Sequence, residues 1–295
     1  MAIPMLAVAG DLVQDVVVWQ LEPVRRGSDT RSRVSIQRGG SAANVAAFAG
    51  PLHPTRFIGC VGPDLGGHVL QQELQGHDVD VRLQWRDVTG TIVVMIDADG
   101  ERSMFPSRGA SARLEAVDPS WLDGVGLLHV PMYAFGPGTT AAAMRGLVAD
   151  AHERGIAVSL DVSSLALIDA MGRDPFTRLV ADLAPRFISA NAHETGALRL
   201  GPASVPHGAT LLARHGGEPT LIVRAGVEPV VVPVPPLGRP PRDLTGAGDA
   251  FNAGFLTHVL RHPHLLDAPP PALVPAVEDG HALAATVLMS PGASN

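Results

Sequence analysis

Short apolar runs alternate along the chain with longer segments in which apolar residues recur at helical spacing. The short runs are residues 6–9, 57–60, 127–130, 157–161, 187–190 and 221–225, and the longer segments are residues 42–49, 67–75, 139–153 and 252–260. A short continuous apolar run is typical of a strand buried on both faces, and an apolar stripe is typical of a helix packed on such a sheet. The pattern predicts an α/β fold with helices on both faces of a mostly parallel sheet.

Three segments depart from this rhythm because they are extended and alternate polar with apolar residues. They are residues 13–19, 30–37 and 91–97, and Met104 and Phe105 follow beyond a turn at Asp99 and Gly100. Alternation with a period of two indicates strands with one exposed face. We expect segments about 13–37 and 91–106 to form a small sheet, a lid, on a single domain spanning residues 1–295. The alternative is that they are edge strands of the main sheet.

Composition narrows the class of protein. The chain has 295 residues, 46% of them hydrophobic, and a net charge of -7, which argues against nucleic acid or an anionic membrane as the main partner. We see no apolar run near the roughly 20 residues of a membrane span and no basic region ahead of the apolar N-terminus. One cysteine, Cys60, excludes an internal disulfide and a cysteine-ligated metal site, which favours the cytoplasm.

All 22 basic residues are arginine, so the chain contains no lysine. A Walker A loop, a protein-kinase ATP lysine and a Schiff-base nucleophile each need that amine and are therefore excluded. Any phosphate bound here would be held by backbone amides, by arginine or by a metal.

The segment 243–251, Asp-Leu-Thr-Gly-Ala-Gly-Asp-Ala-Phe, places a glycine turn before a helical pattern. Gly246 and Gly248 let the N–H groups of residues 246–248 approach an anion at the helix start, and Asp249 faces the same space. An acid beside an anion site indicates a base that accepts a proton from a hydroxyl attacking phosphorus. We expect the helix N-terminus to favour the charged carboxylate and so to make Asp249 a weak base. A dinucleotide fingerprint would need glycine at position 251, where Phe251 stands, and this weakens a nicotinamide-dependent alternative.

Further polar residues follow predicted strands or open predicted helices. Gly39 and Gly40 precede Asn44, whose amide suits sugar hydroxyls, although asparagine is also a common helix cap. Asp11 and Asp15 follow the first strand, where a ligand crevice is expected in α/β folds.

Asn191 and Glu194 open another helix after an apolar strand. They could orient a hydrated magnesium ion, although a capping box would explain the same residues. The histidines show no metal-binding spacing, and His152, His193 and His281 read from the residues alone as surface or packing groups.

In this order the motifs resemble those of the ribokinase, or PfkB, family of sugar and nucleoside kinases. Residues 243–249 are similar to its Asp-Thr-x-Gly-Ala-Gly-Asp signature, with Leu244 in place of threonine. Gly39, Gly40 and Asn44 resemble its substrate motif, Asn191 with Glu194 its Asn-x-x-Glu motif, and residues 102–110 the stretch after the lid strands. Residues 223–228 stand where members often have Thr-x-Gly-x-x-Gly.

The resemblance implies a ribokinase-like three-layer α/β/α sandwich with a β-sheet lid, which moves the γ-phosphoryl group of ATP to a primary hydroxyl with the help of Mg²⁺. It implies Asp249 as catalytic base and the amides of Gly246, Ala247 and Gly248 as anion hole. The expected substrate contacts are Asp11, Asp15, Gly39, Gly40, Asn44 and Arg108, and the expected nucleotide contacts are Asn191, Arg224, Gly226, Gly248 and His281. Glu194 would hold Mg²⁺ through water, and Asp243, Thr245 and residues 290–293 would border a K⁺ site.

The acceptor is expected to be a small sugar or sugar-like metabolite, in a carbohydrate kinase that pairs into a homodimer through its lid. Val16, Val18 and Trp19 are apolar lid residues compatible with that pairing. Two alternatives stay open at this point. A nucleoside acceptor would be favoured if Trp19 or Phe105 stacked on its base, and departures at Leu244 and Arg224 would suit a non-catalytic sugar-binding regulator.

Overall fold

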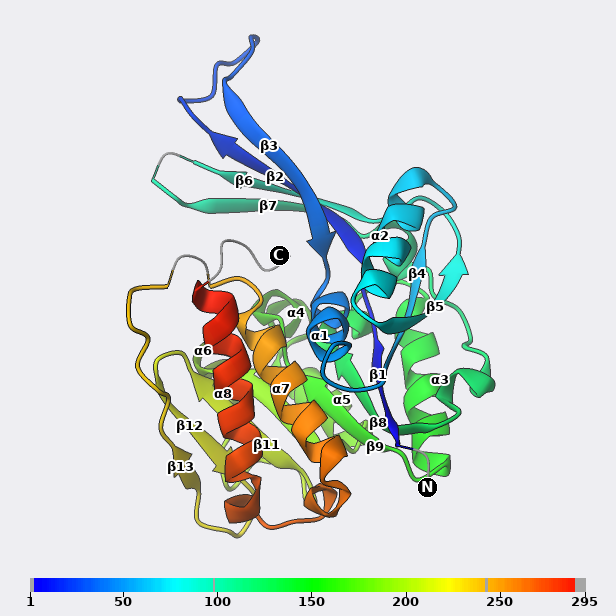
Figure 1. Cartoon of the computed structure of the whole chain (residues 1–295), viewed down its shortest axis with the longest axis vertical. Coiled ribbons are helices and arrows are strands. Elements are labelled where there is room, and N and C mark those ends of the chain that lie inside the picture. Colours follow the sequence, from blue (N-terminus) through cyan, green and yellow to red (C-terminus); the bar gives the residue numbers. More distant parts are fainter. Residues whose placement is uncertain (1–2, 98, 242–243, 290–295) are drawn as a thin grey trace.

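A nine-stranded central sheet forms the frame of the fold in the computed structural model, which describes residues 3–97, 99–241 and 244–289 (Figure 1). The strand order is β13-β12-β11-β10-β9-β8-β1-β4-β5, parallel from β11 to β5, with β12 and β13 continuing it antiparallel. The strands are β1 (Met5–Ala9), β4 (Thr55–Val61), β5 (Val79–Trp85), β8 (Val125–Pro131), β9 (Ala157–Asp161), β10 (Phe187–Asn191), β11 (Thr210–His215), β12 (Glu218–Val223) and β13 (Val230–Val232).

Helices cover both faces of this sheet and bury one apolar cluster on each side. One face carries α1 (Ser41–Ala49), α2 (Leu65–Gly76), α7 (Ala247–Arg261) and α8 (Val274–Met289). The other carries α3 (Thr140–Glu153), α4 (Leu165–Met171), α5 (Arg173–Asp182) and α6 (Ala192–Leu198). Short 3-10 turns lie at Gly109–Ala112, Pro119–Leu122, Met132–Phe135, Pro263–Leu266 and Pro270–Leu273. The predicted three-layer α/β/α class is confirmed.

Residues Pro270–Met289 are long and apolar enough to cross a membrane by length and composition alone, although we expected no run of that length. In the fold, however, α8 packs against α7 and buries Ala276 and Val277 in the apolar cluster of that face. Part of its apolar surface is therefore covered within the protein.

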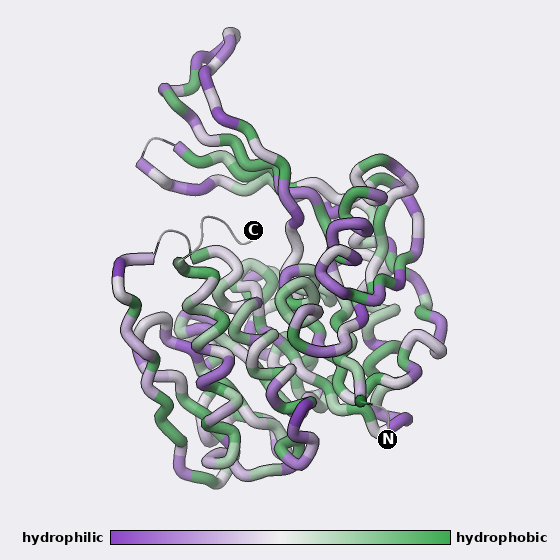
Figure 2. The backbone as a smooth tube through the Cα atoms, in the orientation of Figure 1, coloured by the Kyte–Doolittle hydropathy of each residue, from purple (hydrophilic) through white to green (hydrophobic). Residues whose placement is uncertain are grey.

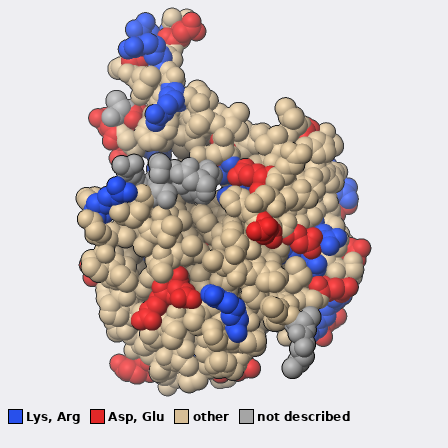
Figure 3. Space-filling model, viewed as in Figure 1, with Lys and Arg blue, Asp and Glu red and all other residues tan. Residues whose placement is uncertain are grey.

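Four strands form a second, smaller sheet that projects from one edge of the main body (Figure 1). They are β2 (Val13–Gln20), β3 (Ser32–Gly39), β6 (Thr91–Ile96) and β7 (Arg102–Ser107), in the order β3-β2-β6-β7. The alternative that these segments are edge strands of the main sheet is therefore wrong. Apolar and polar stretches alternate along them in Figure 2, and basic side chains gather at the far end of this sheet in Figure 3.

The carboxyl ends of the parallel strands meet at one edge of the central sheet. From β1 the chain crosses to β4 and β5 on one side and then to β8, β9, β10 and β11 on the other, so the order reverses at β1. Ligands of open α/β sheets bind in the crevice outside such a switch point. This edge, which the smaller sheet overhangs, is where the site is expected.

Candidate active site

The glycine turn ends at helix α7, and Asp249 lies in the first turn of that helix. Gly246 occupies the N-cap with φ 77°, a left-handed conformation that glycine adopts without strain. Gly246 has no side chain to cap the helix, and the N–H of Ala247 makes a 3.4 Å hydrogen bond to the carbonyl of Leu244. The start of α7 thus offers backbone N–H groups to an anion.

Two side chains of helix α1 hold the Asp249 carboxylate. Ser41 Oγ donates to Oδ1 over 2.6 Å, and Asn44 Nδ2 donates to Oδ2 over 2.9 Å. Burial nevertheless raises the pKa of Asp249 to about 6, against the lowering effect of these two hydrogen bonds. The expectation of a weak base at Asp249 is therefore wrong, because desolvation of the carboxylate outweighs the hydrogen bonds from Ser41 and Asn44.

Gly39 and Gly40 bring the end of β3 against the segment that follows β1. Gly40 has φ 99°, and a methyl group there would lie 2.2 Å from the carbonyl oxygen of Asp11. A methyl group on Gly39 would lie 2.1 Å from Asp15 Oδ1, a buried oxygen with no hydrogen-bond partner in the described part of the chain. Burial raises the pKa of Asp15 to about 6. Both glycines are therefore needed for close approach, and Asp15 keeps an acceptor atom free.

Two other residues expected on the substrate side pair with each other. Arg108 donates to both carboxylate oxygens of Asp11, from Nε over 3.0 Å and from Nη2 over 2.8 Å. This bidentate pair lies beside Gly40, whose Cβ would meet the main chain of the same aspartate.

Arg38, which the sequence analysis missed, is buried beneath this group. Its Nη1 donates to Asn44 Oδ1, and its Nε donates to Glu73 on α2 over 3.2 Å. Asn44 thus connects a buried cation to Asp249, so both ends of its amide are engaged.

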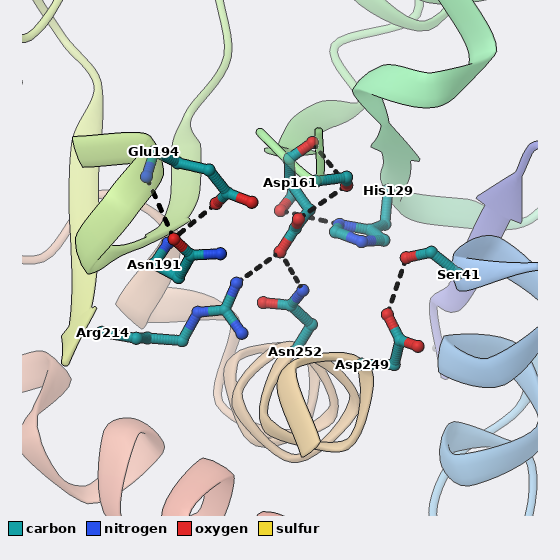
Figure 4. A network of polar contacts seen from close by, with 10 residues as sticks. Ser41, His129, Asp161, Asn191, Glu194, Arg214, Asp249 and Asn252 are labelled. Atoms are coloured by element: carbon teal, nitrogen blue, oxygen red, sulfur yellow. Dashed lines mark hydrogen bonds and ion pairs between the residues drawn. The ribbon is translucent and has the colours of Figure 1, made fainter. Parts of the chain in front are cut away.

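A second polar network lies at the ends of β9, β10 and β11, on the other side of Asp249 (Figure 4). Asp161 Oδ2 accepts hydrogen bonds from Arg214 Nη2 over 2.8 Å and from Asn252 Nδ2 over 2.6 Å. Ser163 Oγ donates to the other oxygen, Oδ1, over 2.6 Å. Arg214 and Asn252 were not among the expected site residues, although Asp161 and Arg214 stand at strand ends and Asn252 lies one turn after Asp249.

Asn191 and Glu194 form a complete capping box at the start of α6, the structural alternative raised from the sequence. Asn191 Oδ1 accepts from the Glu194 N–H over 3.0 Å, and Glu194 Oε2 accepts from the Asn191 N–H over 2.8 Å. Burial, with the nearby charge of Asp161, raises the pKa of Glu194 to about 7. Within the described ranges, no three His, Cys, Asp or Glu side chains gather as a metal-binding group.

Arg224 and Gly226 are not brought to this edge. They follow β12, which runs antiparallel to β11, so they lie at the opposite edge of the sheet. Arg224 is bonded there to Thr210 Oγ1 and to the carbonyl of Ala268. The expectation that they contact nucleotide was wrong because residues 223–228, which were matched to the family's Thr-x-Gly-x-x-Gly motif, lie at the opposite edge.

The hairpin that does lie at the site edge joins β11 to β12 through Gly216 and Gly217. His281 lies on α8. Its Nε2 is 2.8 Å from Thr220 Oγ1, and its ring packs against Phe251. This placement agrees with a packing role.

The expected monovalent-cation site falls largely on residues that the structure does not describe, since Asp243 and residues 290–293 lie outside the described ranges. Thr245 is described, and its Oγ1 accepts a hydrogen bond of 2.5 Å from Arg102 Nη1 on β7. A strand of the smaller sheet therefore contacts the loop that leads into α7.

A helix start that offers N–H groups, with an acid beside it and an overhanging sheet, defines a small-molecule kinase of the ribokinase-like fold. The chain belongs to the pfkB family of carbohydrate kinases, whose family model matches residues 4–295. The predicted family, fold class and carbohydrate-kinase activity are thereby confirmed.

Similar proteins agree with this assignment. The chain is 30% identical over 254 residues to an ATP-dependent ribose-1-phosphate kinase of Halopiger xanaduensis, covering 78% of this chain and 76% of that protein. The adenosine kinase of Sinorhizobium meliloti has a similar fold, with a TM-score of 0.82 at 21% identity over 100% of this chain and 96% of that one. A fructokinase with bound ATP from Xylella fastidiosa gives a TM-score of 0.83 at 18% identity, over 99% and 94% of the two chains.

Proposed function

We propose that this kinase transfers the γ-phosphoryl group of ATP to a hydroxyl group of a sugar, with Asp249 as general base. The hydroxyl oxygen bonds to the γ-phosphorus, its proton passes to Asp249, and ADP leaves. The observation that carries the proposal is a carboxylate with a pKa of about 6 in the first turn of a helix whose N-cap is a glycine. Such a base is ionised at neutral pH, and the N–H groups beside it stabilise charge on the phosphoryl oxygens.

On the acceptor side, the proposal rests on Asp15, whose Oδ1 is free to accept from a sugar hydroxyl. A sugar is favoured over a nucleoside because neither aromatic candidate for base stacking lies near that oxygen. Asp15 pairs with Ile92, and Phe105 pairs with the next residue along that strand, Val93. Because successive side chains of a strand point to opposite faces, Phe105 and Asp15 lie on opposite faces of the smaller sheet. Trp19 lies four residues along the strand from Asp15, about 13 Å away.

On the nucleotide side, we infer that ATP lies over the carboxyl ends of β10 and β11, between Asn191 and the Gly216–Gly217 hairpin. Glu194 would hold Mg²⁺ through water, since this carboxylate already caps α6, and the ion would offset negative charge on the phosphates. A cation nearby would oppose the raised pKa of Glu194.

The smaller sheet acts in this proposal as a lid over the acceptor. The hydrogen bond from Arg102 on β7 to Thr245 joins that sheet to the loop before α7. A lid excludes water, which would otherwise compete with the sugar for the phosphoryl group.

We also infer that a second copy of the chain covers one face of this lid. Ile36, Val16, Val93 and Phe105 are cross-strand neighbours in one row, and Ile36 and Phe105 are 67% and 55% exposed. Sedimentation velocity should give a dimer for the wild type and a monomer for Ile36→Lys. A monomeric wild type would contradict this part of the proposal.

The main test is Asp249→Asn, assayed by ADP release with ATP and a panel of sugars and nucleosides. Turnover should fall roughly 10²- to 10⁴-fold while binding of ATP is retained. Full activity of the variant would remove Asp249 as the base, and activity with nucleosides alone would replace the sugar acceptor.

A further inference from the structure

Arg214 reaches from the end of β11 toward the first turn of α7 (Figure 4). Its side chain is 15% exposed, and its guanidinium lies 5.6 Å from the centre of the Phe251 ring, one turn into that helix. A guanidinium over an aromatic ring in a largely buried setting is held in a fixed place.

The guanidinium touches the turn that offers N–H groups to an anion. A methyl group on Gly248 would lie 2.3 Å from Arg214 Nη1, so this nitrogen occupies the space directly against the Gly248 main chain. Arg214 Nε is buried and has no hydrogen-bond partner in the described part of the chain. Buried donors without partners are rare in proteins, so this one points to a missing acceptor, and Nη1 of the same group lies at the anion site.

Within the described part of the chain, the guanidinium donates to Asp161 from one edge. Nη2 donates to Asp161, which is 5% exposed and is fixed in turn by Asn252 and Ser163. This pair orients Arg214 so that Nη2 faces Asp161 while Nη1 faces Gly248. The pairing accounts for the orientation of the side chain but leaves Nε without an acceptor.

We propose that Arg214 is a catalytic residue that donates a hydrogen bond to a phosphate oxygen of ATP at the start of α7. The inference rests on the proposed function and adds a cation to an anion hole that otherwise consists of backbone N–H groups. In a chain without lysine, Arg214 supplies there the positive charge that an ammonium group would supply elsewhere. Asp161 acts as its positioning residue.

Arg214→Ala and Arg214→Lys test the proposal, with Arg224→Ala as the control arginine because Arg224 lies at the opposite edge of the sheet. We expect kcat to fall roughly 10²- to 10³-fold in Arg214→Ala, with the KM for the sugar changed less than about threefold. Added guanidinium ion should raise the kcat of Arg214→Ala at least about tenfold. Arg214→Lys should have a kcat between those of Arg214→Ala and the wild type. Arg224→Ala should keep the wild-type kcat.

A purely structural role would lower the melting temperature and kcat together without rescue by guanidinium, and that result would overturn the proposal. An unchanged kcat in Arg214→Ala would overturn it equally. If Arg214→Ala does not fold, Arg214→Gln keeps a donor for Asp161 and is measured in its place, with the same loss and rescue expected.

Binding separates this inference from failure of the proposed function. ATP should raise the melting temperature of the wild type more than adenosine does, and Arg214→Ala should lose most of that difference. A wild type that binds ATP in this way but phosphorylates no sugar or nucleoside would refute the function and leave the phosphate contact standing. An ATP-specific shift that is intact in the variant would refute the contact.

Discussion

Ser41 Oγ and Asp249 Oδ1 are 2.6 Å apart although 208 residues separate them in the sequence. Ser41 is the first residue of α1, directly after the lid strand β3 and Gly40, whereas Asp249 stands in the first turn of α7. Two helix starts therefore meet at the carboxylate, one from the acceptor side and one from the phosphate side. The predictions below follow from this meeting point.

Activity should be lost in acid as Asp249 becomes protonated. Burial raises its pKa to about 6, so the ionised base is present above that pH and disappears as the pH falls through it. We expect kcat/KM measured between pH 5 and 9 to decline below about pH 6. An acid limb near pH 4, the usual range of an aspartate, would contradict the raised pKa.

Ser41→Ala should move this acid limb upward. The Ser41 hydroxyl donates to the carboxylate and lowers its pKa, so its removal favours the protonated form. A shift of roughly half a unit to one unit is expected from the loss of one hydrogen bond. Ser35→Ala, on the exposed part of β3, serves as control, and the ionisation of ATP is common to all three profiles. Coincident limbs for wild type and Ser41→Ala would refute the argument.

Asp249→Asn should change how stability depends on pH. The pKa of Asp249 is higher in the folded state than its ordinary value of 3.8, so the ionised carboxylate disfavours folding above about pH 6, and this cost vanishes below about pH 4. The melting temperature of the variant relative to the wild type should therefore increase between pH 4.5 and pH 8, measured by differential scanning fluorimetry. A difference in melting temperature that does not change with pH would argue against the raised pKa.

Arg38→Met should destabilise the fold and weaken catalysis together. The substitution keeps the apolar stem but leaves Asn44 Oδ1 and the Glu73 carboxylate without their donor. We expect a loss of about 1–3 kcal/mol in urea unfolding and a lower kcat, because Asn44 loses one of its two anchors. The matched control is Arg33→Met on the same strand, where the guanidinium lies exposed over the Trp19 ring. Equal stability of the two variants would contradict a structural role for Arg38.

Gly40→Ala should lower kcat/KM and the melting temperature far more than Gly76→Ala does. Its φ of 99° disfavours any side chain, and the new methyl group would lie 2.2 Å from the Asp11 carbonyl oxygen. A loss of at least about tenfold in kcat/KM is expected, together with a lower melting temperature. Gly76→Ala at the end of α2, where nothing lies within 4 Å, should behave as the wild type. Wild-type activity in Gly40→Ala would show that the main chain relaxes there.

Much of the fold follows from patterns that are local in the sequence. The buried strand at residues 157–161 and the helix at 139–153 are read from runs of apolar residues, and β9 and α3 agree with them. Strand β11 was missed because Arg214 and His215 interrupt the apolar run at its end. Residues 223–228 were then matched to the family's Thr-x-Gly-x-x-Gly motif, and Arg224 was expected at the wrong edge.

Only part of the candidate site could be predicted from the sequence, and the reason differs from that for the fold. The glycine turn at residues 246–248 and Asp249 are contiguous in the chain, so the sequence motif predicts how they are arranged in space. The direction of the Asp249 pKa depends on how much protein surrounds the carboxylate, and the contact of Arg38 with Asn44 depends on how β3 meets α1. Such relationships arise from packing between segments distant in sequence, which no local pattern records.

The first turns of α7 supply Gly248, Asp249, which is the proposed base, and Asn252, which donates to Asp161, the partner of Arg214. Because one rigid helix sets all three, their mutual spacing does not depend on the β2, β3, β6 and β7 segments that face the acceptor. On the proposed mechanism, variation in those strands that spares Arg38 and Gly39 can therefore retune the choice of sugar without moving the proposed base, and redesign for a new acceptor should begin there.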